Sequence, residues 1–135
     1  ALPISQTPPH IRTDRFITKA VCHHAALMAN DVKATAISTL TNSGYTAFQI
    51  SAWRPASTIL AFSSEKRILA KMSLLWGVRS FFYDKNVSTD DTVVDINLIA
   101  KERGYVATND YVINLTSMPV EAKGMVNTLR VSQIK

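Results

Sequence analysis

The feature that most restricts the fold of this chain is a regular alternation between two hydrophobic periods. Segments with apolar residues three and four positions apart take turns with short runs rich in β-branched residues. Helices are predicted behind four polar starts, at Thr13 or Asp14, at Thr46 (ending at Trp53), at Ser63 or Ser64, and at Ser88 with Thr89. Strands are predicted at 34–41, 58–62, 78–83, 111–116 and 127–134.

This alternation predicts an α/β fold, a three-layer α/β/α sandwich with helices on both faces of a mostly parallel sheet. The link between the last two strands has about ten residues, too few for the helix of a parallel crossover. The last strand should therefore run antiparallel, which makes the five-stranded sheet mixed. The first helix is expected to pack through one face, whose positions recur at three- and four-residue spacing: Phe16, Ile17, Ala20, Val21, His24, Leu27 and Met28.

Length and composition fit one globular domain. The chain has 135 residues, of which 47% are hydrophobic, enough for one sizeable core. We assign residues 13–135 to this domain and residues 1–12, which contain three prolines, to a linker or domain junction. The apolar runs are too short to cross a bilayer. A single cysteine, Cys22, fits a reducing compartment, so we expect a cytoplasmic protein without a membrane partner.

The net charge of +5 is compatible with an anionic partner. Lysines and arginines are spread along the sequence, however, and no dense basic run is interleaved with aromatic residues. This dispersion argues against nucleic acid as a partner. A small phosphorylated ligand fits the charge better.

A loop suited to phosphate follows the first predicted strand and consists of Thr41, Asn42, Ser43, Gly44, Tyr45 and Thr46. Open parallel sheets bind ligands beyond the carboxyl ends of their strands, where the next helix presents free backbone amides. Hydroxyl and amide donors suit phosphate oxygens, and a glycine lets the backbone approach them closely. On composition alone, an ordinary turn that caps a helix is the favoured explanation of the loop.

An ordered series of motifs along the chain resembles the C-terminal domain of pyruvate kinase. It includes Asp14, residues 17–22 (ITKAVC), residues 41–46 (TNSGYT), Arg54 with Pro55, residues 75–78 (LWGV), Thr89 to Asp91, Gly104, Pro119, Gly124, Asn127, Thr128 and Val131. The resemblance covers the chain from about Asp14 to its end. It implies a five-stranded mixed sheet with a reversed last strand, in agreement with the pattern of elements.

The resemblance also implies a function. In that family the domain regulates an enzyme that converts phosphoenolpyruvate and ADP to pyruvate and ATP, and in many members it binds a phosphorylated effector. The effector loop falls on Thr41 to Thr46. The family's catalytic residues, and the magnesium and potassium ions, belong to a separate barrel of a tetrameric parent. We therefore expect this chain alone to lack cofactors and to be inactive, with the rest of the parent chain and further subunits as partners.

One segment departs from the family pattern. Relatives regulated by a sugar bisphosphate use an arginine in the loop before the last strand and a tryptophan upstream. Here residues 117–124 contain neither, and Lys123 supplies one positive charge while Glu121 would repel a second phosphate. A monophosphorylated effector, with Lys123 as an additional contact, is therefore the expectation. Two other functions stay open: a binding module that works without a barrel, and a purely structural domain for subunit contacts.

Other reactive residues are better explained structurally. Cys22, His23 and His24 are helix neighbours that point about 100 degrees apart, so they do not form a catalytic or metal-binding pair. His24 is expected to be packed or to lie at an interface, and His23 is expected to be more exposed. Asp90 and Asp91 stand at a helix start, where carboxylates favour the dipole. Four aromatic residues are expected in the core or at subunit contacts: Trp53, Trp76, Phe81 and Phe82.

Overall fold

The computed structural model describes residues 14–85, 87–116 and 126–135. Within these residues the helices are α1 (Asp14–Val32), α2 (Tyr45–Ala52), α3 (Lys66–Ser73) and α4 (Thr89–Glu102). The strands are β1 (Ala36–Leu40), β2 (Thr58–Ser63), β3 (Val78–Phe82), β4 (Tyr111–Thr116) and β5 (Thr128–Gln133). Every predicted helix and strand is present, with ends that shift by at most three residues. The linker assigned to residues 1–12 lies outside the described residues.

The strands form one sheet in the order β3-β2-β1-β4-β5. The β1 strand runs parallel to both β2 and β4, and β2 runs parallel to β3. The β4 and β5 strands pair antiparallel, with Tyr111 opposite Gln133 and Thr116 opposite Thr128. The sheet is therefore mixed, and the prediction of a reversed last strand is confirmed.

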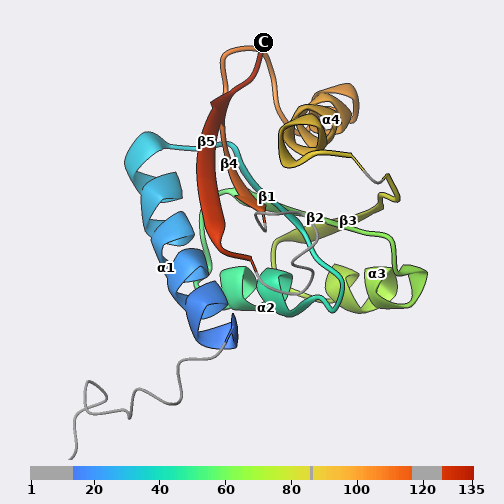
Figure 1. Ribbon diagram of the computed structural model, residues 1–135. Coiled ribbons are helices and arrows are strands. Elements are labelled where there is room, and N and C mark those ends of the chain that lie inside the picture. The colour runs from blue at the N-terminus through green and yellow to red at the C-terminus, as the bar shows by residue number, and fades with distance from the viewer. Residues whose placement is uncertain (1–13, 86, 117–125) are drawn as a thin grey trace, which may run out of the picture.

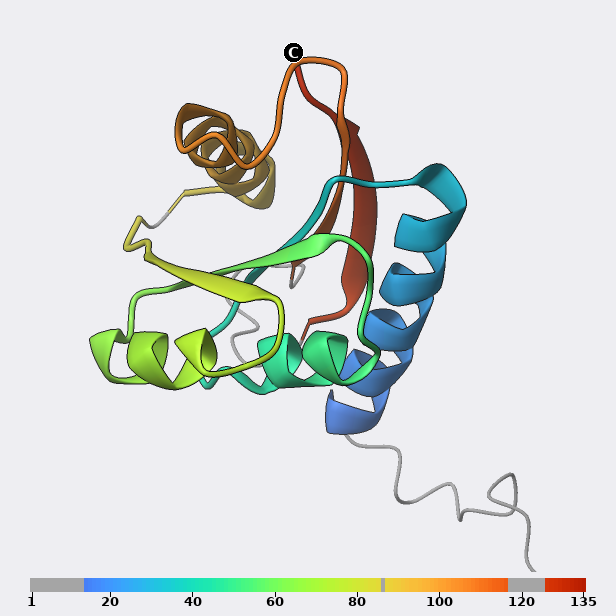
Figure 2. The same ribbon diagram turned by 180° about the vertical axis from the view of Figure 1, so that it is seen from behind.

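Helices cover both faces of the sheet, with α1, α2 and α3 on one side and α4 on the other (Figures 1 and 2). Successive strand residues point to opposite faces. Accordingly, Ile37 and Ile59 join the core beneath α1 to α3, whereas Leu60 and Phe62 join the core beneath α4. The predicted three-layer sandwich is confirmed.

The α1 helix packs through a different face from the one predicted. Its large residues Phe16 and Leu27 are 45% and 48% exposed, and His24 is exposed as well. The buried face carries small side chains: Thr18, Cys22, Ala25, Ala26 and Ala29. Small residues let α1 approach the sheet and α2 closely, and this close contact outweighs the larger apolar area available on the opposite side.

The helix starts were predicted with mixed success. Ser88 caps α4 as expected, because its Oγ accepts a hydrogen bond from the Asp91 N–H at 3.2 Å. For α3 the prediction of a cap at Ser63 or Ser64 is wrong, since the N-cap is Glu65 and no side chain caps this helix. Ser63 ends β2, and its Oγ accepts from the Glu65 N–H at 3.0 Å. A turn bonded by a serine thus precedes the helix.

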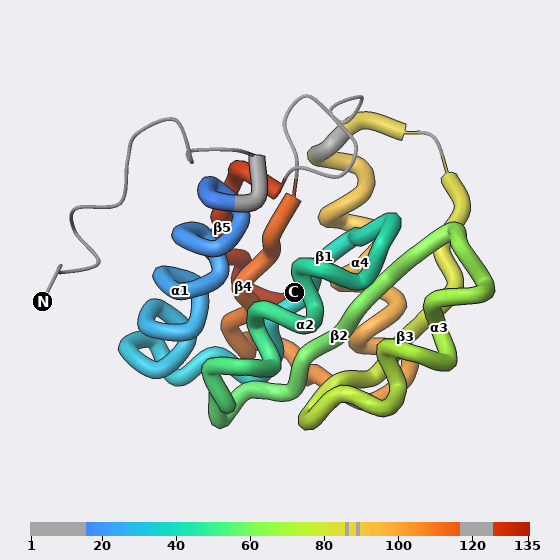
Figure 3. The backbone as a smooth tube through the Cα atoms, turned by 90° about the horizontal axis from the view of Figure 1, so that it is seen from below, coloured from blue at the N-terminus to red at the C-terminus, as the bar shows by residue number. Residues whose placement is uncertain are grey.

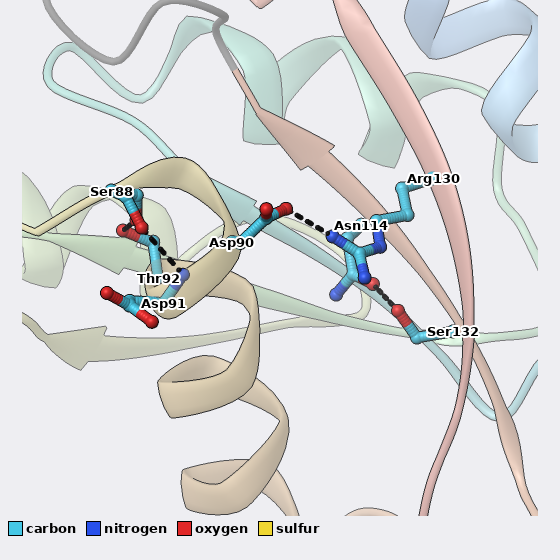
Figure 4. A network of polar contacts seen from close by, with 7 residues as sticks. All are labelled: Ser88, Asp90, Asp91, Thr92, Asn114, Arg130 and Ser132. Carbon is cyan, nitrogen blue, oxygen red and sulfur yellow. Dashed lines mark hydrogen bonds and ion pairs between the residues drawn. The ribbon is translucent and has the colours of Figure 1, made fainter.

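Polar side chains link α4 to the strands β1, β4 and β5, and Figure 4 draws the bond between Asn114 and Ser132. At their centre the side chain of Asn114, on β4, is fully buried. Its amide donates to Ser38 Oγ at 2.7 Å and to Asn97 Oδ1 at 3.1 Å, and its Oδ1 accepts from Ser132 Oγ at 2.6 Å. Three other elements, β1, α4 and β5, therefore take their relative positions from one side chain.

Candidate functional site

The predicted phosphate loop lies at the carboxyl end of β1, where the chain leaves the sheet and enters α2, which lies between α1 and α3 (Figure 3). The Thr41 N–H donates to the Phe62 carbonyl at 2.8 Å, so the β1–β2 ladder continues into the loop. From β1 the chain turns to one face of the sheet, whereas β4 is reached from α4 on the other face. Open α/β sheets bind ligands at such a reversal.

Two side chains of the loop bond to its own backbone. Thr41 Oγ1 accepts from the Gly44 N–H at 3.0 Å, and Ser43 Oγ accepts from the Tyr45 N–H at 3.3 Å. A hydroxyl that accepts a hydrogen bond keeps its own proton for donation. The loop is therefore shaped by the same hydroxyls that were predicted to bind phosphate, and both retain a proton to donate.

Gly44 is the N-cap of α2 and has φ 85° and ψ −2°, in the left-handed region that favours glycine. It provides no side chain to cap the helix, and its carbonyl accepts from the Phe48 N–H at 3.0 Å. A Cβ atom placed on Gly44 would lie 3.3 Å from Met72 Cγ. The glycine is thus needed for its backbone conformation and for close packing against α3.

The loop divides into an outer and an inner part. Asn42 and Ser43 are exposed, whereas Thr41 and Thr46 are buried and Tyr45 is half-buried. An incoming ligand would meet the side chains of Asn42 and Ser43 first. The first turn of an α-helix leaves its backbone N–H groups without intrahelical partners, so the start of α2 adds donors at the same place.

Thr39 stands two residues before the loop on β1. Its Oγ1 is the one buried side-chain oxygen or nitrogen in the described part of the chain that has no hydrogen-bond partner. By strand alternation it shares a face with Ile37, beneath α1 to α3. The apolar face that supports the loop therefore contains an unpaired hydroxyl.

The predicted contact between Lys123 and the effector cannot be compared with the loop, because Lys123 and Glu121 lie outside the described residues. After this segment, Val126 is buried and packs in the core beneath α1 to α3. The Asn127 N–H donates to the Thr116 carbonyl at 3.1 Å, next to the start of β5.

Sequence reasoning did not identify Met72 as a neighbour of the loop. Met72 belongs to the last turn of α3, is 1% exposed and is the residue that a side chain at position 44 would meet. The helical period indicates that Met72 shares a face with Leu69, but no local signal indicates which residue of another element it touches.

Cys22 and the two histidines that follow it differ in exposure. Cys22 is fully buried, and burial raises the pKa of its thiol to about 12, so it is not a thiolate near neutral pH. Its Sγ lies 3.8 Å from the Thr46 carbonyl. The predicted order of exposure of the two histidines is wrong, since His24 is exposed, while His23 is half-buried and stacks on Trp53 with ring centroids 4.2 Å apart.

The described ranges contain no group of three or more His, Cys, Asp and Glu side chains arranged to hold a metal ion. None of the helices in the same ranges is both long and apolar enough to cross a membrane.

The family model and two similar proteins all point to one family. Residues 19–132 match the family model described as "Pyruvate kinase, alpha/beta domain". The pyruvate kinase of Clostridium acetobutylicum is 32% identical over 123 residues, which are 91% of this chain and 25% of that protein. That of Lactobacillus delbrueckii subsp. bulgaricus is 30% identical over 118 residues, 87% of this chain and 20% of that protein.

A solved structure shares the fold. The crystal structure of a pyruvate kinase from Cryptosporidium parvum superposes with a TM-score of 0.79 at 22% sequence identity, over 97% of this chain and 24% of that one. This chain therefore spans between a fifth and a quarter of the length of the relatives that it matches.

Proposed function

This chain belongs to the family of the pyruvate kinase alpha/beta domain, and from that premise we propose that it is the C-terminal regulatory domain of a longer, cytoplasmic pyruvate kinase. In this proposal the loop Thr41–Thr46 binds the phosphate group of an effector. The observation that carries it is the geometry of the loop at the reversal of strand order, where Gly44 opens α2 without a side-chain cap.

The donors available at the loop suit one phosphate group. Asn42 and Ser43 offer an exposed amide and an exposed hydroxyl. The buried Thr41 already accepts from the Gly44 amide and keeps its hydroxyl proton for the ligand. No residue from Thr41 to Thr46 is charged, so binding would rest on neutral donors and on the positive end of the α2 dipole.

We propose a small monophosphorylated metabolite as the effector. A bisphosphate would need a second cationic grip, which we assign at most to Lys123. Effector binding would act on catalysis by changing how this domain packs against the rest of the parent and against other subunits of a tetramer. The phosphoryl transfer, with its magnesium and potassium ions, would be carried out by the remainder of the parent chain.

The test is a titration of the domain with inorganic phosphate, ribose 5-phosphate, AMP and fructose 1,6-bisphosphate, followed by the NMR shifts of the amides from Thr41 to Thr46. We expect saturable shifts centred there with a monophosphate. The Ser43→Ala variant should bind about tenfold more weakly, because it loses one hydrogen bond to a charged group. Ser64→Ala is the matched control, an exposed serine that follows β2 as the loop follows β1.

Silence of the loop amides with all four compounds would reject the effector site and leave a structural role in subunit contacts. The intact mass of the native gene product tests the other half of the proposal. A protein of about 135 residues would favour a binding module that works without a barrel.

A further inference from the structure

An open groove lies between α4 and β5, on the face of the sheet opposite to α2 (Figures 1 and 2). Its volume is about 510 Å³. Small-molecule sites in proteins typically occupy roughly 300–1,000 Å³. The β5 strand stands last in the order of the sheet, so the groove runs along an edge of the described fold. One wall comes from α4 and the other from β5 and the two residues that follow it: Val93, Val94, Asn97, Leu98 and Lys101, and residues 130–135.

Apolar side chains form the middle of the groove. Val94 and Leu98 lie one turn apart on α4 and are 62% and 53% exposed. Across from them Ile134 is buried and belongs to the core beneath α4. Apolar surface gains free energy when it is removed from water. A ligand with an apolar body would supply that cover for Val94 and Leu98.

Cations stand at both ends of the groove. At one end Arg130 Nη1 lies 2.8 Å from Asp90 Oδ1, and this ion pair compensates the charge (Figure 4). At the other end Lys101 and Lys135 are both exposed. Among the described residues that line the groove there is no Asp or Glu. The carbonyls at the end of α4 offset only about half an elementary charge, so the Lys101 end favours an anion.

Hydrogen-bond donors are available beside this positive end. Lys101 Nζ donates to the Lys135 carbonyl at 2.6 Å, which uses one of its three N–H groups. Asn97 lies on the same side of α4, four residues before Lys101. Its Oδ1 accepts from Asn114, which leaves its two amide N–H groups for another acceptor. A carboxylate has acceptor oxygens alone and therefore suits this set of donors.

The two walls are fixed relative to each other. Asn114 donates to Asn97 Oδ1 at 3.1 Å and accepts from Ser132 Oγ at 2.6 Å, so one buried side chain holds both α4 and β5. The ion pair between Arg130 and Asp90 closes the same two elements at one end. A groove whose walls are already in place loses little conformational freedom when a ligand enters it.

We propose that this groove binds a small carboxylic acid with an apolar body, of the class of aliphatic and aromatic monocarboxylates. The carboxylate accepts hydrogen bonds from Lys101 and Asn97, and the apolar body lies along Leu98 and Val94. The groove is separate from the phosphate loop, which leads into α2 on the opposite face of the sheet. This inference therefore goes beyond the proposed function and does not depend on it.

A monocarboxylate fits the groove better than a phosphate does. Phosphate sites commonly use the amino end of a helix, where the dipole is positive. Lys101 instead belongs to the last turn of α4, where backbone carbonyls repel a dianion more strongly than a monoanion. A phosphate ion also has no apolar part with which to cover Val94 and Leu98.

The experiment titrates the 135-residue chain with three compounds that share one apolar body: phenylpropionate, phenylpropanol and phenylpropylamine. Methyl NMR shifts of Val94, Leu98 and Ile134 report binding. We expect saturable shifts with the acid, with an affinity at least about tenfold higher than that of the alcohol, because the acid gains hydrogen bonds to a charged group. The amine should bind more weakly than the alcohol, since Lys101 and Lys135 repel it.

Two pairs of variants separate the roles of charge and apolar cover. Lys101→Gln should lower the affinity for the acid about tenfold and leave that for the alcohol unchanged, whereas Lys66→Gln, at an exposed site on α3, should alter neither. Leu98→Ala should weaken the acid and the alcohol alike. Leu74→Ala, at the 88% exposed leucine that follows α3, is its control and should have no effect.

Three outcomes would overturn the inference. The first is the absence of saturable methyl shifts with the acid. The second is equal affinity for the acid and the amine, which would reduce the groove to an apolar crevice without anion recognition. The third is inorganic phosphate that shifts the same methyl groups with the affinity of the acid, which would indicate an unspecific anion site. Phosphate binding at the effector loop is read separately, from the amides of Thr41 to Thr46.

Discussion

The two faces of the sheet are held by different forces. Beneath α1 to α3 the core consists of small and aliphatic side chains, and the side-chain hydrogen bonds from α1 into it are long, 3.3 Å from Thr18 Oγ1 to the Val126 carbonyl and 3.8 Å from Cys22. Beneath α4 the apolar core surrounds the Asn114 network, with bonds of 2.6 to 3.1 Å.

The two faces therefore differ in how much displacement their contacts tolerate. Apolar packing is non-directional, so α1 can shift slightly while keeping most of its contacts. A buried amide with fixed partners tolerates no such shift, because each displacement leaves a polar group unpaired. The phosphate loop belongs to the face that can adjust. Ser132, on the reversed strand, belongs to the face that cannot.

The largest expected effect comes from a cavity on the adjustable face. Ile59 is fully buried beneath α1 to α3, and Ile59→Ala should lower the free energy of unfolding by about 3 kcal/mol. Guanidinium denaturation measures it. Val94→Ala, at a 62% exposed position on α4, is the control and should change stability by less than about 0.5 kcal/mol. A loss below about 1 kcal/mol for Ile59→Ala would show that this face collapses around the gap.

The second prediction concerns the polar face. Asn114→Ala should cost about 2 kcal/mol, because it leaves Ser38, Asn97 and Ser132 without their shared partner. The double variant with Ser132→Ala should lose less than the sum of the two single variants, because both changes remove the same bond. If the losses in free energy of unfolding add strictly in denaturant titrations, the side chains do not form a connected network, and the contrast with the other face is lost.

The third prediction is a dependence on pH. Tyr83 donates to Asp95 Oδ2 at 2.8 Å, and burial, followed by the contact with Asp95, raises the pKa of its phenol to about 12. Because the folded state holds this proton more tightly than the unfolded state, the added stability is complete below pH 10 and is lost as the pH rises towards 12.

Tyr83→Phe should lower stability by about 1.5 kcal/mol near pH 7 and should flatten the loss above pH 10. Denaturation series at pH 7, 9 and 11 measure both effects. Cys22 loses its proton in an overlapping range, since its pKa also rises to about 12, so the comparison is made in a Cys22→Ala background. An unchanged slope in Tyr83→Phe would assign the alkaline loss to other groups.

The smallest effect distinguishes two glycines. Gly44 and Gly104 have φ of 85° and 82°, but an added Cβ meets Met72 at position 44 and nothing within 4 Å at position 104. Each Gly→Ala change should cost about 1 kcal/mol from the backbone conformation. Gly44→Ala should cost only about 0.5 kcal/mol more, because a methionine on an adjustable face can move. A much larger difference in denaturation would mean that α3 is held rigidly against the loop.

Periodicity in the sequence was sufficient to predict the elements and their layers. The β4 strand was predicted with its observed ends, and the short link before β5 correctly indicated an antiparallel pair. These predictions succeed because strand and helix periods are local and because short loops restrict connections. The same reasoning located the turn that carries Gly44, since glycine and hydroxyl residues between two elements are a local signal.

Contacts between distant segments could not be predicted in this way. Nothing near Asn114 in the sequence indicates that it joins Ser38 and Ser132, and nothing near Gly44 indicates Met72. The face of α1 was chosen wrongly because size was taken as the sign of burial, whereas close packing required alanine and cysteine. Whether the loop binds phosphate stays a prediction, because its wall at Lys123 lies outside the described residues.

The hydrogen bonding of β1 affects the entropy of binding of any ligand at the loop. The strand is hydrogen-bonded on both edges, to β2 and to β4, and four of its five residues are buried. Its amides should be among the last to exchange with deuterium, so the loop begins from an anchor that is already immobile in the empty protein. Ordering the few residues up to Gly44 then costs little entropy, and even a ligand as small as a phosphate ion can repay it.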